Sequence, residues 1–271
     1  MKKLLLILLC LPLIGFGQVN IPDANFKAYL VGNLAINTNG DSEIQVSEAT
    51  AFNGTINCNQ MYIFDLTGIG AFTALTELQC QNNQLTSLDV SNNTALTYLD
   101  CAPAGIINQL TSLDISNNIN LNTLICPNNQ ISSLDVSQNT ALTSLSCGNN
   151  LLDSLDVSNN TNLGWLDCYN NQLTSLDVRN GNNTNLIYFN GTSNPNRTCI
   201  NVDDVFYSTT IWANIDPQHY FSTNCPPSAI QELTINKQLL KITDLLGRET
   251  KATNQPLFYI YDDGTVEKRI V

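Results

Sequence analysis

The strongest constraint on the fold is a repeat of about 21 residues that runs from Leu75 to Asn190. A complete copy has a first half of the form L-x-x-L-x-C-x-N-N and a second half of the form L-x-S-L-D-V-S-N-N, and a worn copy, LIYFNG, starts at Leu186. Successive copies begin at steps of 21, 25, 21, 21 and 23 residues. A repeat of this length predicts a solenoid, in which each coil packs only on its neighbours. Solenoids display columns of side chains and seldom bury a reaction centre.

Both halves of the repeat predict short strands. Leucine alternates with Cys or Val as inward and outward positions do in a strand, and the Asn-Asn pairs then turn the chain. We therefore expect a mainly β solenoid with two narrow parallel sheets. Six cysteines share one inward position, and we expect buried thiols there, with a cross-rung disulfide or a metal as the alternatives. They are Cys58, Cys80, Cys101, Cys126, Cys147 and Cys168.

The pattern resembles the leucine-rich repeat superfamily, and more narrowly the secreted repeat proteins of flavobacteria. The resemblance covers IPDANFKAYLVGNLAINTNG, the LTSLDVSNNTALTYLDC repeats, NPNRTCINVDDVFYS and the tail LLKITDLLGRETK…PLFYIYDDGTVEKRIV. That tail resembles a short form of the C-terminal sorting signal of the type IX secretion system. The resemblance implies a surface or secreted protein that binds or adheres rather than catalyses. The chain departs from the pattern by an insertion at Ala102–Ile107.

The ends of the chain predict export. Lys2 and Lys3 precede an apolar run from Leu4 to Ile14, which is typical of a secretory signal and too short to span a bilayer. No other apolar run is long enough for a membrane helix, so we expect a secreted protein or one on the outer-membrane surface of a bacterial cell. The expected segments are a signal peptide (1–17), an N-terminal cap (18–55), the repeat solenoid (56–191), a C-terminal cap (192–227) and the sorting tail (228–271).

Charge and composition exclude several functions. Residues 18–227 hold 17 of the 23 acidic residues but only three basic ones, Lys27, Arg179 and Arg197. Such a surface repels phosphate backbones, which argues against nucleic-acid binding. His219 is the only histidine, which removes most catalytic triads and metal sites. We therefore predict no enzymatic activity, with a hydrolase that uses paired carboxylates as a distant alternative.

The sequence of the N-terminal cap predicts a helix followed by a loop that binds a cation. Residues 22–35 read as a helix with Asp23 as N-cap and an apolar face that includes Leu34. The segment NTNGDSEIQVSE then spaces oxygen ligands as an EF-hand does, which predicts a low-affinity calcium ion. Two residues depart from the EF-hand pattern: Asn37 replaces the usual first Asp, and Ser42 replaces the Gly at the turn. The alternative interpretation is a turn that binds no ion. The expected ligands are Asn37, Asn39, Asp41, the carbonyl of Glu43, and Glu48.

The C-terminal cap contains the two cysteines that stand outside the column. In an oxidising compartment Cys199 and Cys225 are expected to form a disulfide. The segment between them is rich in aromatic side chains, which we expect to form the core of the cap. These are Phe206, Tyr207, Trp212, Tyr220 and Phe221.

A column of aspartates lies at an outward position of the second-half strands. Charges about 5 Å apart repel, so something must offset the repulsion. We favour hydrogen bonds from the backbone N–H groups of the following turn, and the alternative is a ladder that gathers cations. The residues are Asp65, Asp89, Asp114, Asp135, Asp156 and Asp177.

The outward positions of the first-half strands, here called the first-half face, vary and carry aromatic residues. Aromatic side chains anchor protein interfaces and suit sugar rings, so this face predicts the binding surface for an extracellular protein or glycan. Two alternatives stay open: the C-terminal cap covers the rings, or the chain is a structural spacer or stalk without a specific ligand. The predicted ligand-binding residues are Tyr98, Trp165, Asp167, Tyr169 and Tyr188.

Overall fold

The computed structural model describes residues 17–103, 109–226, 239–243, 256–261 and 266–270. The chain divides into two compact units, Met1–Cys225 and Pro226–Val271, and each is described by itself. Most of the expected signal peptide and most of the insertion lie outside the described residues. Within the described ranges, no helix has the length and apolar character needed to cross a membrane.

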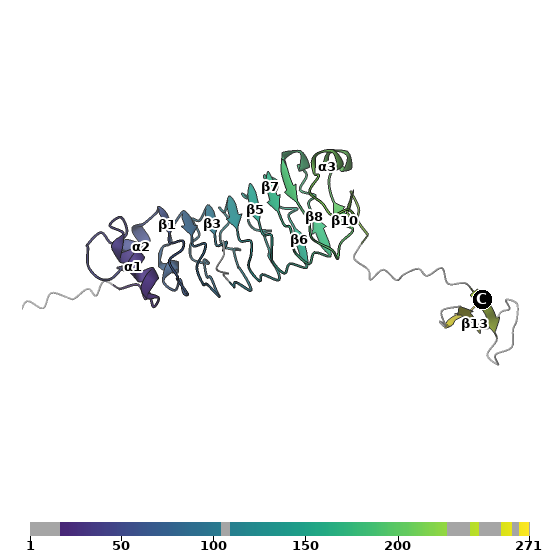
Figure 1. Cartoon of the computed structure of the whole chain (residues 1–271), viewed down its shortest axis with the longest axis horizontal. Coiled ribbons are helices and arrows are strands. Elements are labelled where there is room, and N and C mark those ends of the chain that lie inside the picture. Colours follow the sequence, from purple (N-terminus) through teal and green to yellow (C-terminus); the bar gives the residue numbers. More distant parts are fainter. Residues whose placement is uncertain (1–16, 104–108, 227–238, 244–255, 262–265, 271) are drawn as a thin grey trace, which may run out of the picture. The chain divides into compact units, whose positions relative to one another are not determined.

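The first-half segments form one parallel sheet of seven strands in the order β1-β2-β3-β4-β5-β7-β9, which follows the chain from rung to rung (Figure 1). Each strand has a buried middle residue between two more exposed ones, and the rungs pair in step, so that Leu145 faces Leu166. The strands are β1 (Thr55–Asn57), β2 (Glu77–Gln79), β3 (Tyr98–Asp100), β4 (Thr123–Ile125), β5 (Ser144–Ser146), β7 (Trp165–Asp167) and β9 (Tyr188–Asn190).

A second parallel sheet follows the order β11-β10-β8-β6 and covers only the later rungs. The prediction of two parallel sheets is therefore confirmed, but the second is shorter than expected. In the earlier rungs the Ser-Leu-Asp segments do not pair as strands in the part of the chain that the structure describes. The strands are β6 (Ser154–Asp156), β8 (Ser175–Asp177), β10 (Cys199–Asn201) and β11 (Tyr220–Ser222).

The six cysteines of the column are fully buried beside the leucines, and none of them forms a disulfide. Burial raises the pKa of Cys58, Cys126 and Cys168 to about 12, because the thiolate would lose its hydration. The prediction of buried thiols is confirmed. The column acts as a row of small apolar side chains that lets the rungs pack closely.

Two ladders of buried asparagines close the turns. In the first-half ladder, the side-chain amide of Asn150 donates to the carbonyls of Cys126 and Cys147 at 3.0 and 3.1 Å, and its oxygen accepts from Ile131 N at 3.0 Å. In the second-half ladder, Asn139 donates to Ile115 O and Asn118 O. Each amide thus joins two rungs and satisfies backbone groups that would otherwise be buried without partners. The first ladder is Asn83, Asn129, Asn150, Asn171 and Asn194; the second is Asn93, Asn118, Asn139 and Asn160.

The aspartate column is held by its own turns. Asp135 Oδ1 accepts a hydrogen bond from Ser137 N at 2.8 Å, and the side-chain and backbone hydrogen bonds of Ser137 lower the pKa of that carboxyl. The prediction that each carboxylate accepts from the backbone of the following turn is confirmed, and the donor is the residue two positions later. The same bond forms at Asp65, Asp89, Asp114, Asp156 and Asp177.

The N-terminal cap contains two helices rather than one. Helix α1 (Ala24–Gly32) begins at Asp23, whose carboxylate accepts from the backbone of Asn25 and Phe26 as predicted. Its buried face consists of Phe26 and Leu30, whereas Leu34 lies beyond the helix and is 79% exposed. The prediction of a longer helix whose apolar face includes Leu34 was therefore wrong. Helix α2 (Val46–Ala51) was not expected and lies where the sequence suggests the end of a cation loop.

The C-terminal cap closes the other end of the solenoid with helix α3 (Val205–Ile211) (Figure 1). A disulfide joins Cys199 and Cys225. The core of the cap is Trp212, which packs against Phe189, Tyr207 and Phe221. The expectation that all five aromatics fill this core was wrong for two of them, because Phe206 and Tyr220 are exposed.

The second unit contains a three-stranded antiparallel sheet in the order β12-β13-β14. Four runs of the tail alternate apolar and polar residues, LTI, LLKITDLL, LFYIY and TVEKRIV, and they predict a small C-terminal β appendage. The strands lie in the last three runs, while the first, at Leu233–Ile235, lies outside the described residues. The strands are β12 (Leu239–Thr243), β13 (Pro256–Tyr261) and β14 (Val266–Ile270).

Candidate functional site

Two aromatic rings lie together on the first-half face, one exposed and one half-buried. Trp165 on β7 is directly opposite Tyr188 on β9 in the parallel register. Their rings stack with centroids 3.7 Å apart and planes 9° from parallel. Trp165 is 43% exposed, so the C-terminal cap does not cover it. The indole is therefore available to a partner, and its stacking on Tyr188 fixes its orientation before any partner arrives.

Asp167 lies on the same strand as Trp165 and faces the same side. Burial raises the pKa of its carboxyl, although hydrogen bonds from Tyr169 and Asn190 oppose that effect. Its Oδ1 atom is shielded from solvent and has no hydrogen-bond partner among the described residues. A shielded acceptor without a donor is costly, whereas the residue as a whole is partly exposed and presents its charge on the first-half face.

The same combination of ring and carboxylate recurs three rungs earlier. Tyr98 and Asp100 occupy on β3 the positions that Trp165 and Asp167 occupy on β7. Burial raises the pKa of Asp100 as well, although Ala102 N donates to its Oδ1 at 3.0 Å. The positions between the two pairs carry shorter side chains: Thr123 and Ile125 on β4, and Ser144 and Ser146 on β5.

Tyr169 follows β7 and does not join the stacked pair. Its hydroxyl accepts a hydrogen bond from Asn149 of the preceding rung at 2.5 Å. Its ring lies over Gly148, where an added Cβ would come within 2.3 Å of the ring. The absence of a side chain at Gly148 is thus what allows Tyr169 to lie along the rungs. The structure places Tyr169 beside the Trp165–Tyr188 pair rather than within it.

The predicted calcium loop is closed by its own hydrogen bonds. Glu48 is only 8% exposed. Its Oε1 accepts from Thr38 N, Thr38 Oγ1 and Asn39 N at 2.8–3.0 Å, and its Oε2 accepts from Gln45 N at 2.9 Å. Burial alone would raise the pKa of Glu48, but these hydrogen bonds outweigh it and lower the pKa.

The other predicted calcium ligands also have protein partners. Asp41 accepts from Glu43 N and from the side chains of Asn39 and Gln45, while Asn37 accepts from Gly40 N. Lys27 and Glu43 form an ion pair at 2.6 Å. Among the described residues no three or more His, Cys, Asp or Glu side chains cluster as a metal site would require. An ion here would depend on amide and carbonyl oxygens and would have to displace donors from Glu48.

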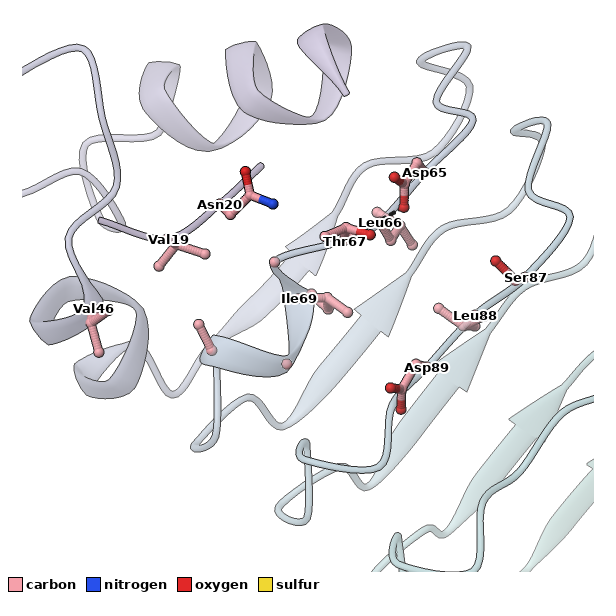
Figure 2. Close-up of a pocket in the computed structure, with 13 residues that line it drawn as sticks. Val19, Asn20, Val46, Asp65, Leu66, Thr67, Ile69, Ser87, Leu88 and Asp89 are labelled. Carbon is pink, nitrogen blue, oxygen red and sulfur yellow. Dashed lines mark hydrogen bonds between the residues drawn. The ribbon is translucent and has the colours of Figure 1, made fainter. Parts of the chain in front are cut away.

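A hollow of about 470 Å³ lies between the N-terminal cap and the first rungs, and the repeat pattern did not predict it. Figure 2 shows Val19 and Val46 on the side of the cap, and Leu88 and Asp89 on the side of the rungs. Gly68, with φ of 104°, lets the N-terminal segment approach closely, since a Cβ there would lie 2.8 Å from Asn20 O. Segments distant in sequence form this hollow, which is why a repeat pattern could not reveal it.

A second hollow of about 420 Å³ lies over the later second-half segments. Its lining consists mainly of serine hydroxyls and aspartates from three successive rungs, such as Ser154 and Asp156. These aspartates already accept hydrogen bonds from their own turns. The side chains on this face are uniform, in contrast to those on the first-half face.

Comparison with known proteins supports the repeat architecture and leaves the ligand open. No family model matches the chain. A stretch of 74 residues, 27% of the chain, is 42% identical to Internalin J of Listeria monocytogenes serotype 4b (strain F2365), and it spans only 8% of that relative. The fold is a leucine-rich repeat solenoid.

Two solved structures from Listeria monocytogenes are also similar to the chain. One is a functional domain of InlJ that includes a cysteine ladder, with 26% identity over 70% of this chain and 59% of that chain, and a TM-score of 0.36. The other is an internalin C2, with 19% identity over 74% of this chain and 93% of that chain, and a TM-score of 0.43. None of these relatives is flavobacterial, so a flavobacterial origin stays a proposal.

Proposed function

We propose that the chain is a secreted or cell-surface interaction module that binds an extracellular protein or glycan through its first-half face and does not catalyse a reaction. The observation that carries this proposal is the exposed indole of Trp165, which stacks on the half-buried ring of Tyr188. Large rings held rigidly on strands lose little entropy on binding, which makes them suited to anchor an interface. The similarity to Internalin J over part of the chain points in the same direction.

The runner-up is a structural spacer without a specific ligand. The uniform serines and aspartates of the second-half face favour it, since such a surface offers few anchors. An exposed indole on the opposite face is the observation that a spacer does not account for.

Replacing Trp165 and Tyr188 together by alanine should abolish binding to any partner recovered from an array of glycans and extracellular proteins. The melting temperature should stay nearly unchanged, because the rings lie on the surface and their middle-strand neighbours Leu166 and Phe189 keep the core intact. Phe206→Ala is a matched control, since that ring is 83% exposed on the C-terminal cap and should leave binding intact. A large loss of stability in the double variant, or normal binding by it, would overturn the proposal.

The tail is proposed to direct export through the type IX secretion machinery. The support is its resemblance to the sorting signals of that system and the sheet of β12, β13 and β14, which belongs to the second compact unit of the chain. Deleting residues 230–271 in a host with that machinery should leave the protein in the periplasm, as measured by fractionation. Secretion of the truncated chain at the normal level would contradict this role.

We also propose weak calcium binding by the loop from Asn37 to Glu48. Binding must be weak because the ion has to compete with the four donors on Glu48. At a calcium concentration ten times the dissociation constant, the cap should gain about 1.4 kcal/mol, seen as a rise in melting temperature. Asp41→Ala should lose that rise. No rise at millimolar calcium in the unaltered protein would end the idea.

A further inference from the structure

The orientation of the stacked pair leaves one aromatic face open. Tyr188 covers one face of the Trp165 indole, so the other face is directed along the solenoid toward the rung of β5. There the opposite residue is Ser144, and Asp167 is opposite Ser146. Both serines are small, so the space over them is bordered by the flat face of the indole on one side and by the carboxylate of Asp167 close by.

That space suits a planar cation. A guanidinium group stacks on an indole face and donates N–H groups to a carboxylate at the same time. Asp167 is partly exposed beside the indole, so its carboxylate offers a counter-charge to an arginine, while its shielded Oδ1 atom has no donor among the described residues. Burial raises the pKa of Asp167, and the hydrogen bonds from Tyr169 and Asn190 offset that rise only in part, so the carboxylate gains from a nearby positive charge.

We infer that the first-half face binds an extended segment of a protein partner through two arginine side chains, one at Trp165 and Asp167 and the other at Tyr98 and Asp100. This inference rests on the proposed binding function and names the chemistry of the partner. The two pairs occupy the same columns three rungs apart, a separation of about 14 Å along the solenoid. In an extended chain, residues four positions apart are separated by about 13–14 Å and point to the same side.

The charge of the surroundings favours the same partner. Residues 55–190 contain ten acidic side chains and a single basic one, Arg179. Arg179 is engaged by Asp177 on the second-half side. The strands of the first-half sheet carry Glu77 in addition to the two aspartates and no basic residue at all. A cationic segment therefore meets no repulsion on this face, and the negative field accelerates its approach.

The test uses the full chain and labelled glycine- and serine-rich peptides that contain two arginines four residues apart, with affinity measured by fluorescence anisotropy. We expect this peptide to bind. A peptide with glutamine in place of both arginines should not bind. A peptide with the arginines three residues apart should bind roughly tenfold more weakly, because its side chains point to opposite sides.

Variants of the protein distinguish binding at the two predicted arginine sites from general attraction to the negative charge of the protein. Asp167→Asn keeps the shape of the side chain and should weaken peptide binding roughly tenfold, with an unchanged melting temperature as evidence that the fold is intact. Asp100→Asn should do the same at the other end. Asp135→Asn removes one charge from the second-half face and should leave binding unaltered.

Several outcomes would overturn the inference. One is that Asp135→Asn and Asp167→Asn weaken peptide binding equally. Another is that the glutamine peptide binds as tightly as the arginine peptide, and a third is that the arginine peptide does not bind. If the arginine peptide fails while a glycan binds in a manner that needs Trp165 and Tyr188, the proposed function stands and only this inference is lost. If the Trp165 and Tyr188 variants also bind every recovered partner normally, both the proposed function and this inference are wrong.

Discussion

Replacing Asn150 by alanine should lower the free energy of unfolding by about 3–5 kcal/mol, a large share of the stability of a typical domain. The side chain is buried and joins two rungs through the carbonyls of Cys126 and Cys147, and it accepts from Ile131 N. Alanine leaves these groups buried without partners, and each costs on the order of 1–3 kcal/mol. Chemical denaturation should show the loss as a lower midpoint.

The matched control is Asn159→Ala in the next turn of the chain. Asn159 is exposed, so its loss should change stability by less than about 0.5 kcal/mol. Amide hydrogen exchange would show whether the rungs around Cys126 and Cys147 open first in the Asn150 variant, since each rung depends only on its neighbours. Equal effects of the two substitutions would mean that the ladder does not hold the rungs together.

Replacing Glu48 by alanine should destabilise the N-terminal cap by about 2–4 kcal/mol. One carboxylate here satisfies the backbone N–H groups of Thr38, Asn39 and Gln45, and hydrogen bonds to a charged group are stronger than neutral ones. The melting temperature of the variant is the direct measurement. Glu43→Ala is the control, because Glu43 forms only a partly exposed ion pair with Lys27 and such pairs contribute at most about 1 kcal/mol.

Lowering the pH should cause part of the same loss of stability in the unaltered protein. The folded state lowers the pKa of Glu48, so its contribution is fully present above the pKa of an unfolded glutamate, about 4.3. It is lost as the pH falls through the lower folded value. Melting temperatures should therefore converge in acid for the unaltered protein and the Glu48→Ala variant. A constant difference across that range would show that the carboxylate charge does not matter.

The repeat made most of the fold predictable. The spacing of Leu, Cys and Asn fixes the direction of each side chain, so the parallel strands, the buried thiols and the bonds at Asp135 follow from one repeat unit. The caps were harder because they do not repeat. Helix α2 was missed since its capping box, formed by Gln45 and Glu48, occupies the same residues as the calcium pattern. Both interpretations demand a glutamate at position 48, and only the backbone conformation distinguishes them.

The candidate site was predictable in outline only. Alternation places Trp165, Asp167 and Tyr188 on one face, but stacking at 3.7 Å depends on rotamers that a sequence does not specify. The position of the Tyr169 ring depends on the space left by Gly148 in the preceding rung, because glycine has no side chain. The absence of a donor at Asp167 Oδ1 likewise emerges only when all neighbours are in place.

The buried thiols have a consequence for how long the folded protein lasts. While the solenoid is closed, a pKa of about 12 at Cys58, Cys126 and Cys168 leaves almost no thiolate to react. An opened rung exposes thiols that can exchange with the Cys199–Cys225 disulfide or with outside oxidants. In an oxidising compartment such a chain becomes covalently trapped. The working lifetime is then set by the rate of unfolding, and equilibrium stability matters less than the height of that barrier.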